Sequence, residues 1–137
     1  MKLYTEMQVA VGSFLGSPLA GGILMSRNAK VAGDLSNARR IIVISILATG
    51  GVLALGIVLG FVLPRRSGGN YLIPLLGAWA MRLWYRRVQG EYLTIRFPDS
   101  ARASWWRTIG ISSLVAVGLL ALLFGAAYIY VVATEQA

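Results

Sequence analysis

The side chains that most often carry out catalysis are scarce in this sequence, and two of the usual ones are absent. The chain has no histidine and no cysteine, so it lacks the common ligand sets for zinc, haem and iron–sulfur clusters. Its acidic residues all lie outside the long apolar runs and are Glu6, Asp34, Glu91, Asp99 and Glu135. No pair of them has a spacing suited to general acid–base catalysis. We therefore expect a protein that is not an enzyme and that uses no metal or cofactor.

Ionisable side chains are also missing from the interiors of the apolar runs. Proton-coupled carriers and pumps usually bury such groups near the middle of the membrane, because a moving charge needs a site there. Only Arg82 comes close, near the end of a short apolar stretch. We interpret Arg82 as an interfacial anchor whose guanidinium reaches the headgroups along its aliphatic stem. A transporter or ion channel acting alone is therefore disfavoured.

The composition places the chain in a membrane. Of its 137 residues, 57% are hydrophobic and 13% are charged, whereas a soluble domain is about 45–50% apolar and about 25% charged. The apolar residues gather into long uncharged runs, and no soluble domain is left over, so we expect a single transmembrane domain. The formal charge of +8 comes from basic residues that flank these runs. Such residues point to anionic lipid headgroups as partners and not to nucleic acid.

The sequence predicts an all-α bundle of four membrane segments. The runs 41–63 and 108–134 carry no charge and exceed the roughly 20 residues that cross a hydrocarbon core as a helix. Trp105, Trp106 and Arg107 precede the second of them and are expected to anchor it at the headgroup level.

The other two predicted segments leave alternatives open. The run 7–26 contains Pro18, which should kink or break a helix there. We expect a retained kinked span or a re-entrant pair of half-helices, since a cleaved signal peptide fits its flank poorly. The stretch 71–85 is short, so it is either a tilted span or an interfacial amphipathic helix.

The positions of lysine and arginine predict a topology. If all four segments cross, ten basic residues lie on one side, namely Arg27, Lys30, Arg39, Arg40, Arg82, Arg86, Arg87, Arg96, Arg102 and Arg107. Lys2, Arg65 and Arg66 then lie on the other. If 71–85 does not cross, the split is nine against four in the opposite orientation. We prefer four spans, with the loops 27–40 and 86–107 in the cytoplasm and both termini and the 64–70 turn outside. We also expect Leu93, Ile95 and Phe97 to dip into the headgroups.

Small residues at helical spacing are the main positive signal for binding. Gly56 and Gly60 form a G-x-x-x-G pair, Gly12 and Gly16 form another beside Pro18, and Ala121 and Gly125 form a similar small-residue pair. Two small residues four apart give a helix a flat face that another backbone can approach closely. The motif is common in apolar segments, so each pair is a candidate either for packing within the chain or for a partner face. We expect Gly56 and Gly60 to face another helix of this chain.

The start of the chain resembles a group of small bacterial inner-membrane proteins with no assigned function. The resemblance rests on Tyr4, on F-L-G-S-P-L-A-G over residues 14–21, and on Asn28. V-Q-G over 88–90 and S-W-W-R-T-I-G-I over 104–111 are similar to later landmarks of that group. This resemblance implies a bacterial inner-membrane location and assigns no site residues.

These observations favour a non-enzymatic membrane protein that binds a protein partner in the bacterial inner membrane, either another membrane protein or itself. A concrete form is an immunity-type protein that engages a membrane-acting toxin. A second hypothesis is a lipid- or small-molecule-handling protein that binds its ligand at the broken helix around Pro18. A third is a homo-oligomer that forms a pore.

Overall fold

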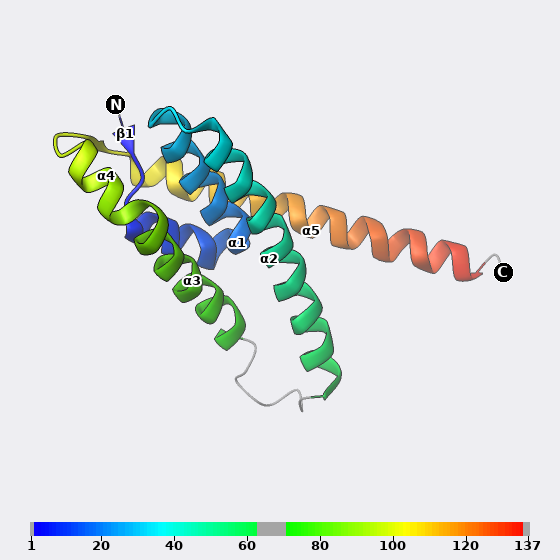
Figure 1. Ribbon diagram of the computed structural model, residues 1–137. Coiled ribbons are helices and arrows are strands. Elements are labelled where there is room, and N and C mark those ends of the chain that lie inside the picture. Colours follow the sequence, from blue (N-terminus) through cyan, green and yellow to red (C-terminus); the bar gives the residue numbers. More distant parts are fainter. Residues whose placement is uncertain (1, 63–70, 136–137) are drawn as a thin grey trace.

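The computed structural model describes residues 2–62 and 71–135 and confirms the predicted all-α bundle (Figure 1). Its main helices are α1 (Glu6–Val31), α2 (Leu35–Val62), α3 (Leu72–Tyr85) and α5 (Trp105–Glu135). Helices α1, α2 and α5 are long and apolar enough to cross a membrane. The expected turn 64–70 lies outside the described residues.

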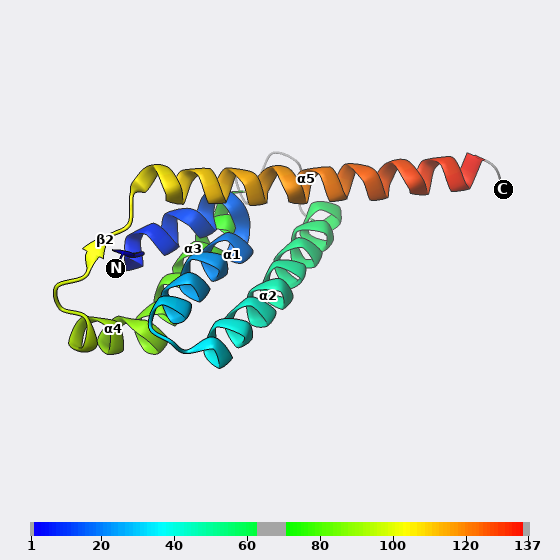
Figure 2. The same cartoon turned by 90° about the horizontal axis from the view of Figure 1, so that it is seen from above.

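Helix α1 is folded back on itself and does not run straight across the bundle. Its helical geometry is interrupted at Gly16 and at Ser17, where φ is 76° and ψ is 169°. Proline disfavours helical geometry in the residue before it, so Pro18 forces Ser17 out of the helix. The two halves then return toward each other, and the Asn28 side chain bonds both backbone groups of Tyr4. Of the two forms expected for the first segment, the structure has the re-entrant pair of half-helices (Figures 1 and 2).

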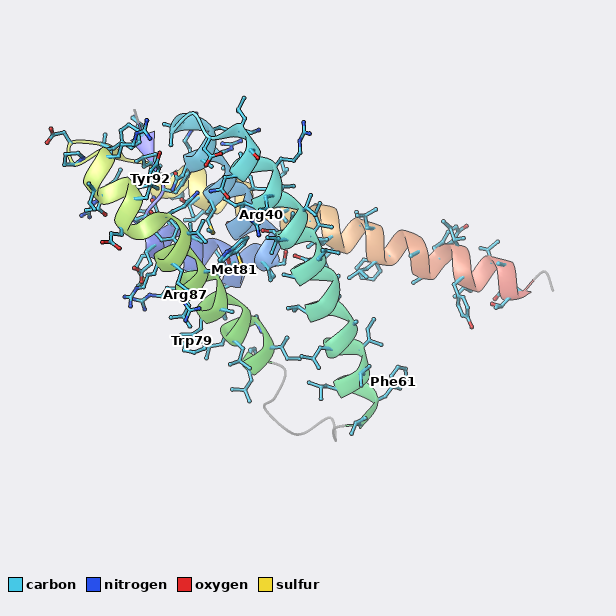
Figure 3. All side chains as sticks on the ribbon, in the orientation of Figure 1. Arg40, Phe61, Trp79, Met81, Arg87 and Tyr92 are labelled. Carbon is cyan, nitrogen blue, oxygen red and sulfur yellow. The ribbon has the colours of Figure 1, made fainter. Side chains whose placement is uncertain are left out.

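The folded α1 is the centre of the bundle. Helices α2, α3 and α5 each pack mainly on α1, and they pack little or not at all on one another. The ends of α2 and α5 that are far from α1 point in different directions in Figure 1. Met81 on α3 is buried against the core, whereas Phe61 projects from the free end of α2 with 87% of its surface exposed (Figure 3). The buried core therefore lies around α1, and the outer helix ends are apolar and uncovered.

Short elements join the end of α3 to the start of α5. A π-helical turn, η2 (Arg86–Gly90), continues α3 and leads into α4 (Glu91–Arg96). Strand β2 (Ala101–Arg102) follows and pairs in parallel with β1 (Lys2–Leu3). Leu93 on α4 is buried in the core, and Phe97 packs against it. The expectation that Leu93 inserts into headgroups is therefore wrong, whereas Phe97 is only partly buried and Ile95 is exposed.

The pairing of β1 with β2 corrects the predicted topology. A first segment that crosses the membrane predicts that the N-terminus lies on the opposite side from 86–107. The structure puts Lys2 beside Ala101, so these two regions lie on one side. The re-entrant α1 returns the chain to the side from which it started, and Lys2 joins the basic majority.

This topology can be tested with single cysteines, since the chain has none of its own. We expect Lys2→Cys and Ser100→Cys to be equally protected from a membrane-impermeant maleimide on intact cells. Glu135→Cys should be labelled, because the apolar part of α5 separates it from the basic side. All three should react after the cells are permeabilised. Different labelling of residues 2 and 100 on intact cells would contradict the re-entrant α1.

Candidate functional site

A buried polar network holds the two ends of α1 together. The amide nitrogen of Tyr4 donates to Oδ1 of Asn28 at 2.8 Å, and Nδ2 of Asn28 donates to the carbonyl oxygen of Tyr4, also at 2.8 Å. Asn28 has no exposed surface. Tyr4 lies just before α1, so its backbone N–H and C=O groups have no partners within a helix. The side-chain amide of Asn28 supplies a partner for each of them. Because buried backbone groups need partners, these two hydrogen bonds hold the two halves of α1 in their folded-back arrangement, called the α1 hairpin below.

A capping box at the start of α1 connects the network to α5. The amide of Gln8 donates to Oγ1 of Thr5 at 3.3 Å, and the amide of Thr5 donates to Oε1 of Gln8 at 2.9 Å. The Nε2 group of Gln8 also donates to the carbonyl oxygen of Ala103 at 2.6 Å. Ala103 lies just before α5, and its own amide donates to the carbonyl oxygen of Leu3 at 2.8 Å. One glutamine thus caps α1 and ties it to the start of α5.

Two polar side chains join the end of α3 to the same network. The hydroxyl of Tyr85 donates to the carbonyl oxygen of Tyr4 at 3.0 Å, and Nε2 of Gln89 donates to the carbonyl oxygen of Met25 at 2.8 Å. Gln89 lies in the π-helical turn. Such turns shift the register of a helix and often place a side chain for a specific contact. Here the turn directs Gln89 onto the second half of α1.

An ion pair closes this end of the bundle. Glu6 accepts hydrogen bonds from the Nε atoms of Arg82 and Arg86, the latter at 2.8 Å. The hydrogen bond to Glu6 raises the pKa of the Arg86 guanidinium above its usual value. The sequence predicts that Arg82 is an interfacial anchor whose guanidinium contacts the lipid headgroups. The structure also gives it a protein partner, which joins α3 to the start of α1.

The break in α1 lies beside a cavity of about 460 Å³. Ser17 and Pro18 line it, together with Gly56 of α2 and Pro74 and Gly77 of α3. The amide of Leu19 donates to Oγ1 of Thr49 at 2.9 Å, so α2 satisfies a donor that the break exposes. The hydroxyl oxygen of Ser17 is buried and has no hydrogen-bond partner among the described residues.

The predicted small-residue faces have different surroundings. A Cβ atom at Gly16 would overlap the carbonyl oxygen of Ser112 on α5, and one at Gly12 would lie 2.8 Å from Leu24 Cδ1 and 3.1 Å from Ser112 Oγ. Pro18 is also buried. This first pair therefore packs within the chain.

The other two pairs do not pack in this way. No described atom lies within 4 Å of a Cβ placed at Gly56, Gly60 or Gly125, and Ala121 is exposed. Gly56 faces α1 and α3 only across the cavity beside Pro18, and Gly60 is exposed, so the close helix contact expected at these two glycines is absent among the residues that the structure describes. Spacing alone identified flat faces but could not say which of them the fold covers.

The predicted anchors lie in the first turn of α5. Trp105 is 48% exposed and Trp106 is 82% exposed, and Arg107 is exposed as well. All three are free to contact lipid at that level. Gln8, Tyr85 and Gln89 belong to the polar network but were not among the residues predicted from the sequence. The T-x-x-Q spacing of residues 5–8 is a capping-box signal, whereas nothing in the sequence indicated which atoms Tyr85 and Gln89 would contact.

No group of three or more acidic residues that could hold a metal ion occurs within residues 2–62 and 71–135. Comparison of the chain with protein-family models, curated proteins and solved structures found no match.

Proposed function

We propose that this chain is a non-enzymatic membrane protein of the bacterial inner membrane, and that the C-terminal half of its helix α5 binds a helix of a protein partner. The observation that carries the proposal is the exposure of that half-helix. Thr108 and Ser112 are buried against the bundle, whereas almost every residue from Ser113 to Glu135 is exposed. Figure 2 shows the C-terminal end of α5 extending alone beyond the other helices.

Lipid alone gives a poor account of the residues on this half-helix. Gly118, Ala121 and Gly125 are three and four residues apart and so lie on one side of α5. In lipid, helices are held together by close van der Waals contact, and small residues allow their backbones to approach. A helix that only anchors the protein gains nothing from such a face. The free half of α5 therefore has the composition of a helix-binding surface.

The length of α5 fits the same role. Its 31 residues make a helix roughly 46 Å long at a rise of 1.5 Å per residue. This exceeds the hydrocarbon core of about 30 Å, so α5 can cross the membrane and still pack its first turns on α1. Protection against a membrane-acting toxin is one specific form of this function, in which the toxin supplies the partner helix.

A photo-crosslinking amino acid on α5 tests the proposal. We expect the crosslinker at Leu122, beside Gly118 and Gly125, to yield a discrete protein adduct in native membranes. At Leu120, on the opposite side of the helix, the yield should be much lower. Both side chains are exposed, at 71% and 53% respectively. An adduct with a second copy of the chain would identify the partner as the protein itself.

A second variant separates specific binding from chance collision. We expect Gly125→Leu to reduce the adduct roughly tenfold, since a bulky side chain keeps the partner backbone away. The melting temperature of the purified chain should not change, because no described atom lies within 4 Å of a Cβ at Gly125. Crosslinks to lipid only, or an adduct that is insensitive to Gly125→Leu, would contradict the proposal.

A further inference from the structure

An apolar groove runs between the first half of α1 and helix α3, away from the α5 surface just described. Its volume is about 350 Å³, and it is lined by Met7, Val11 and Phe14 on α1 and by Leu75 and Trp79 on α3, with Arg82 at one end. Met7 and Phe14 are 53% and 44% exposed, and Trp79 is 59% exposed. Figure 3 shows the Trp79 side chain on the outer side of α3.

The groove follows matching stripes on two antiparallel helices. Residues 7, 11 and 14 repeat at helical spacing on α1, and residues 75, 79 and 82 repeat in the same way on α3. Because Glu6 is bonded to Arg82, the start of α1 lies beside the end of α3. The groove is therefore apolar along most of its length and ends at a cation.

At its charged end the groove continues into a second cavity, of about 490 Å³. Both cavities share Met7 and Arg82, and Glu6, Gln8, Arg102 and Trp105 also line the second one. Arg86 bonds to Glu6 as well, so three arginines and one glutamate give this end a formal net charge of +2. Tryptophan is typical of the headgroup level, and Trp105 marks that level here.

The arginines retain hydrogen-bond donors for a ligand. Arg82 and Arg86 both use Nε to bind Glu6. A guanidinium has five N–H donors, and the terminal nitrogens of Arg82 and Arg86 have no acceptor among the described residues. Glu6 thus orients the two groups without occupying them. Planar guanidinium donors of this kind suit the oxygen atoms of a phosphate.

We infer that the groove and its charged end bind one anionic phospholipid. One acyl chain lies along Met7, Val11 and Phe14, opposite Trp79, and the phosphate lies against Arg82 and Arg102. The groove has the polarity of the membrane core, and the positive cavity lies at its headgroup end. The combined site matches a molecule that has an apolar chain and an anionic head. It is a separate function from the partner binding proposed for α5 and uses different residues.

Tryptophan quenching tests this site in the full-length, detergent-purified protein. We expect phosphatidylglycerol with brominated acyl chains to quench the fluorescence in a saturable way. Brominated phosphatidylcholine should need a concentration about fivefold higher or more, because its headgroup carries no net charge. The conservative Trp79→Phe variant, which keeps the groove apolar, should lose most of the saturable component, and the remainder should come from Trp105 at the charged end.

Charge variants then test the headgroup end. Arg102→Gln should raise the half-saturating concentration of phosphatidylglycerol about fivefold, the effect of one arginine near an anionic headgroup. Arg39→Gln removes the same charge from α2, where Arg39 lines a different cavity, and should leave binding unchanged. Arg82→Gln should weaken binding at least as much as Arg102→Gln. If loss of the Glu6 pair unfolds it, Arg102→Gln and Trp79→Phe decide the question.

Three results would overturn the site. Equal quenching by the two brominated lipids would show that the headgroup charge is not recognised. Equal effects of Arg39→Gln and Arg102→Gln would reduce the attraction to the general charge of the protein. Saturable quenching that survives in full in the double variant Trp79→Phe/Trp105→Phe would place the bound chain outside this groove.

Discussion

Gly16→Ala is expected to lower the melting temperature of the detergent-solubilised protein sharply. A Cβ at this position would overlap the carbonyl oxygen of Ser112 and would lie 2.9 Å from its Cα atom. These are backbone atoms of α5, so no side-chain rotation relieves the overlap and the two helices must move apart. Overpacking of a well-packed site typically costs about 1–3 kcal/mol. Displacement of α5 should also expose Ser112, which is fully buried in the parent.

The same substitution at Gly60 is the matched control. No described atom lies within 4 Å of a Cβ there, and alanine favours a helix over glycine by about 1 kcal/mol. We expect Gly60→Ala to melt with the parent or slightly above it. The measurement is a thermal unfolding curve for each variant in the same detergent. A Gly16→Ala protein that melts with the parent would show that α1 and α5 do not meet at Ser112.

The contrast between these two glycines shows where the sequence stops being informative. Both belong to G-x-x-x-G pairs in uncharged runs, and spacing gives both a flat helix face. Which face is covered depends on how α1 folds. The two halves of α1 place Gly12 and Gly16 against α5, whereas α2 passes the bundle with Gly60 outside it. Which face is covered is determined by contacts between residues far apart in the chain, and helical spacing gives no information about such contacts.

The membrane class was predictable because it depends on local properties. Runs of uncharged residues such as 41–63 need no knowledge of tertiary structure to be identified as membrane helices, since backbone groups in lipid must be satisfied within the segment. Pro18 likewise indicated an interruption from its own chemistry. The direction of the chain after Pro18 could not be predicted in this way, because it does not depend on nearby residues alone. It follows from a positive φ at Ser17 and from hydrogen bonds between Tyr4 and Asn28.

The count of lysine and arginine residues gave the wrong side of the membrane for the N-terminus, for a related reason. Counting assigns sides by assuming that each apolar segment crosses, and 7–26 is long enough to do so. The structure returns this segment to its starting side, which places Lys2 with the ten basic residues already counted together. The other basic residues of the sequence are Arg65 and Arg66, in the turn 64–70, which lies outside the described residues. The corrected topology has a stronger positive bias than the predicted one, so the positive-inside rule supports it.

Arg82 gives a further example of information that no local pattern holds. Its place near the end of a short apolar stretch indicated an anchor at the interface, and its exposure agrees with contact at that level. Its ion pair with Glu6 joins residues that are far apart in sequence. The sequence showed one acid at the start of the chain and several arginines near residue 86, but any of these arginines could have been its partner.

Asn28→Leu should have the other large effect on stability. Leucine has a similar size, so it leaves little empty space, but it removes both hydrogen bonds to Tyr4. The amide of Tyr4 would then be buried without a partner, which costs about 1–3 kcal/mol, and the carbonyl oxygen of Tyr4 would keep only its hydrogen bond from the Tyr85 hydroxyl. The hairpin should open locally, since these bonds join its two ends. We expect a markedly lower melting temperature and much faster hydrogen exchange at the amide of Tyr4.

Two variants make the cause of this loss clear. Asn28→Asp has the same shape and, when protonated, keeps one donor and one acceptor for Tyr4, so at low pH its melting temperature should lie between those of the parent and Asn28→Leu, whereas ionisation would bury a charge at this site. Asn37→Leu makes the same exchange in the first turns of α2, where the side chain is only partly buried, and should melt close to the parent. If Asn28→Leu melts with Asn37→Leu, the hairpin is held by its apolar contacts and Asn28 is not its main tie. If Asn28→Leu is the least stable of the three and Tyr4 alone loses exchange protection early, the fold of α1 rests on one buried amide.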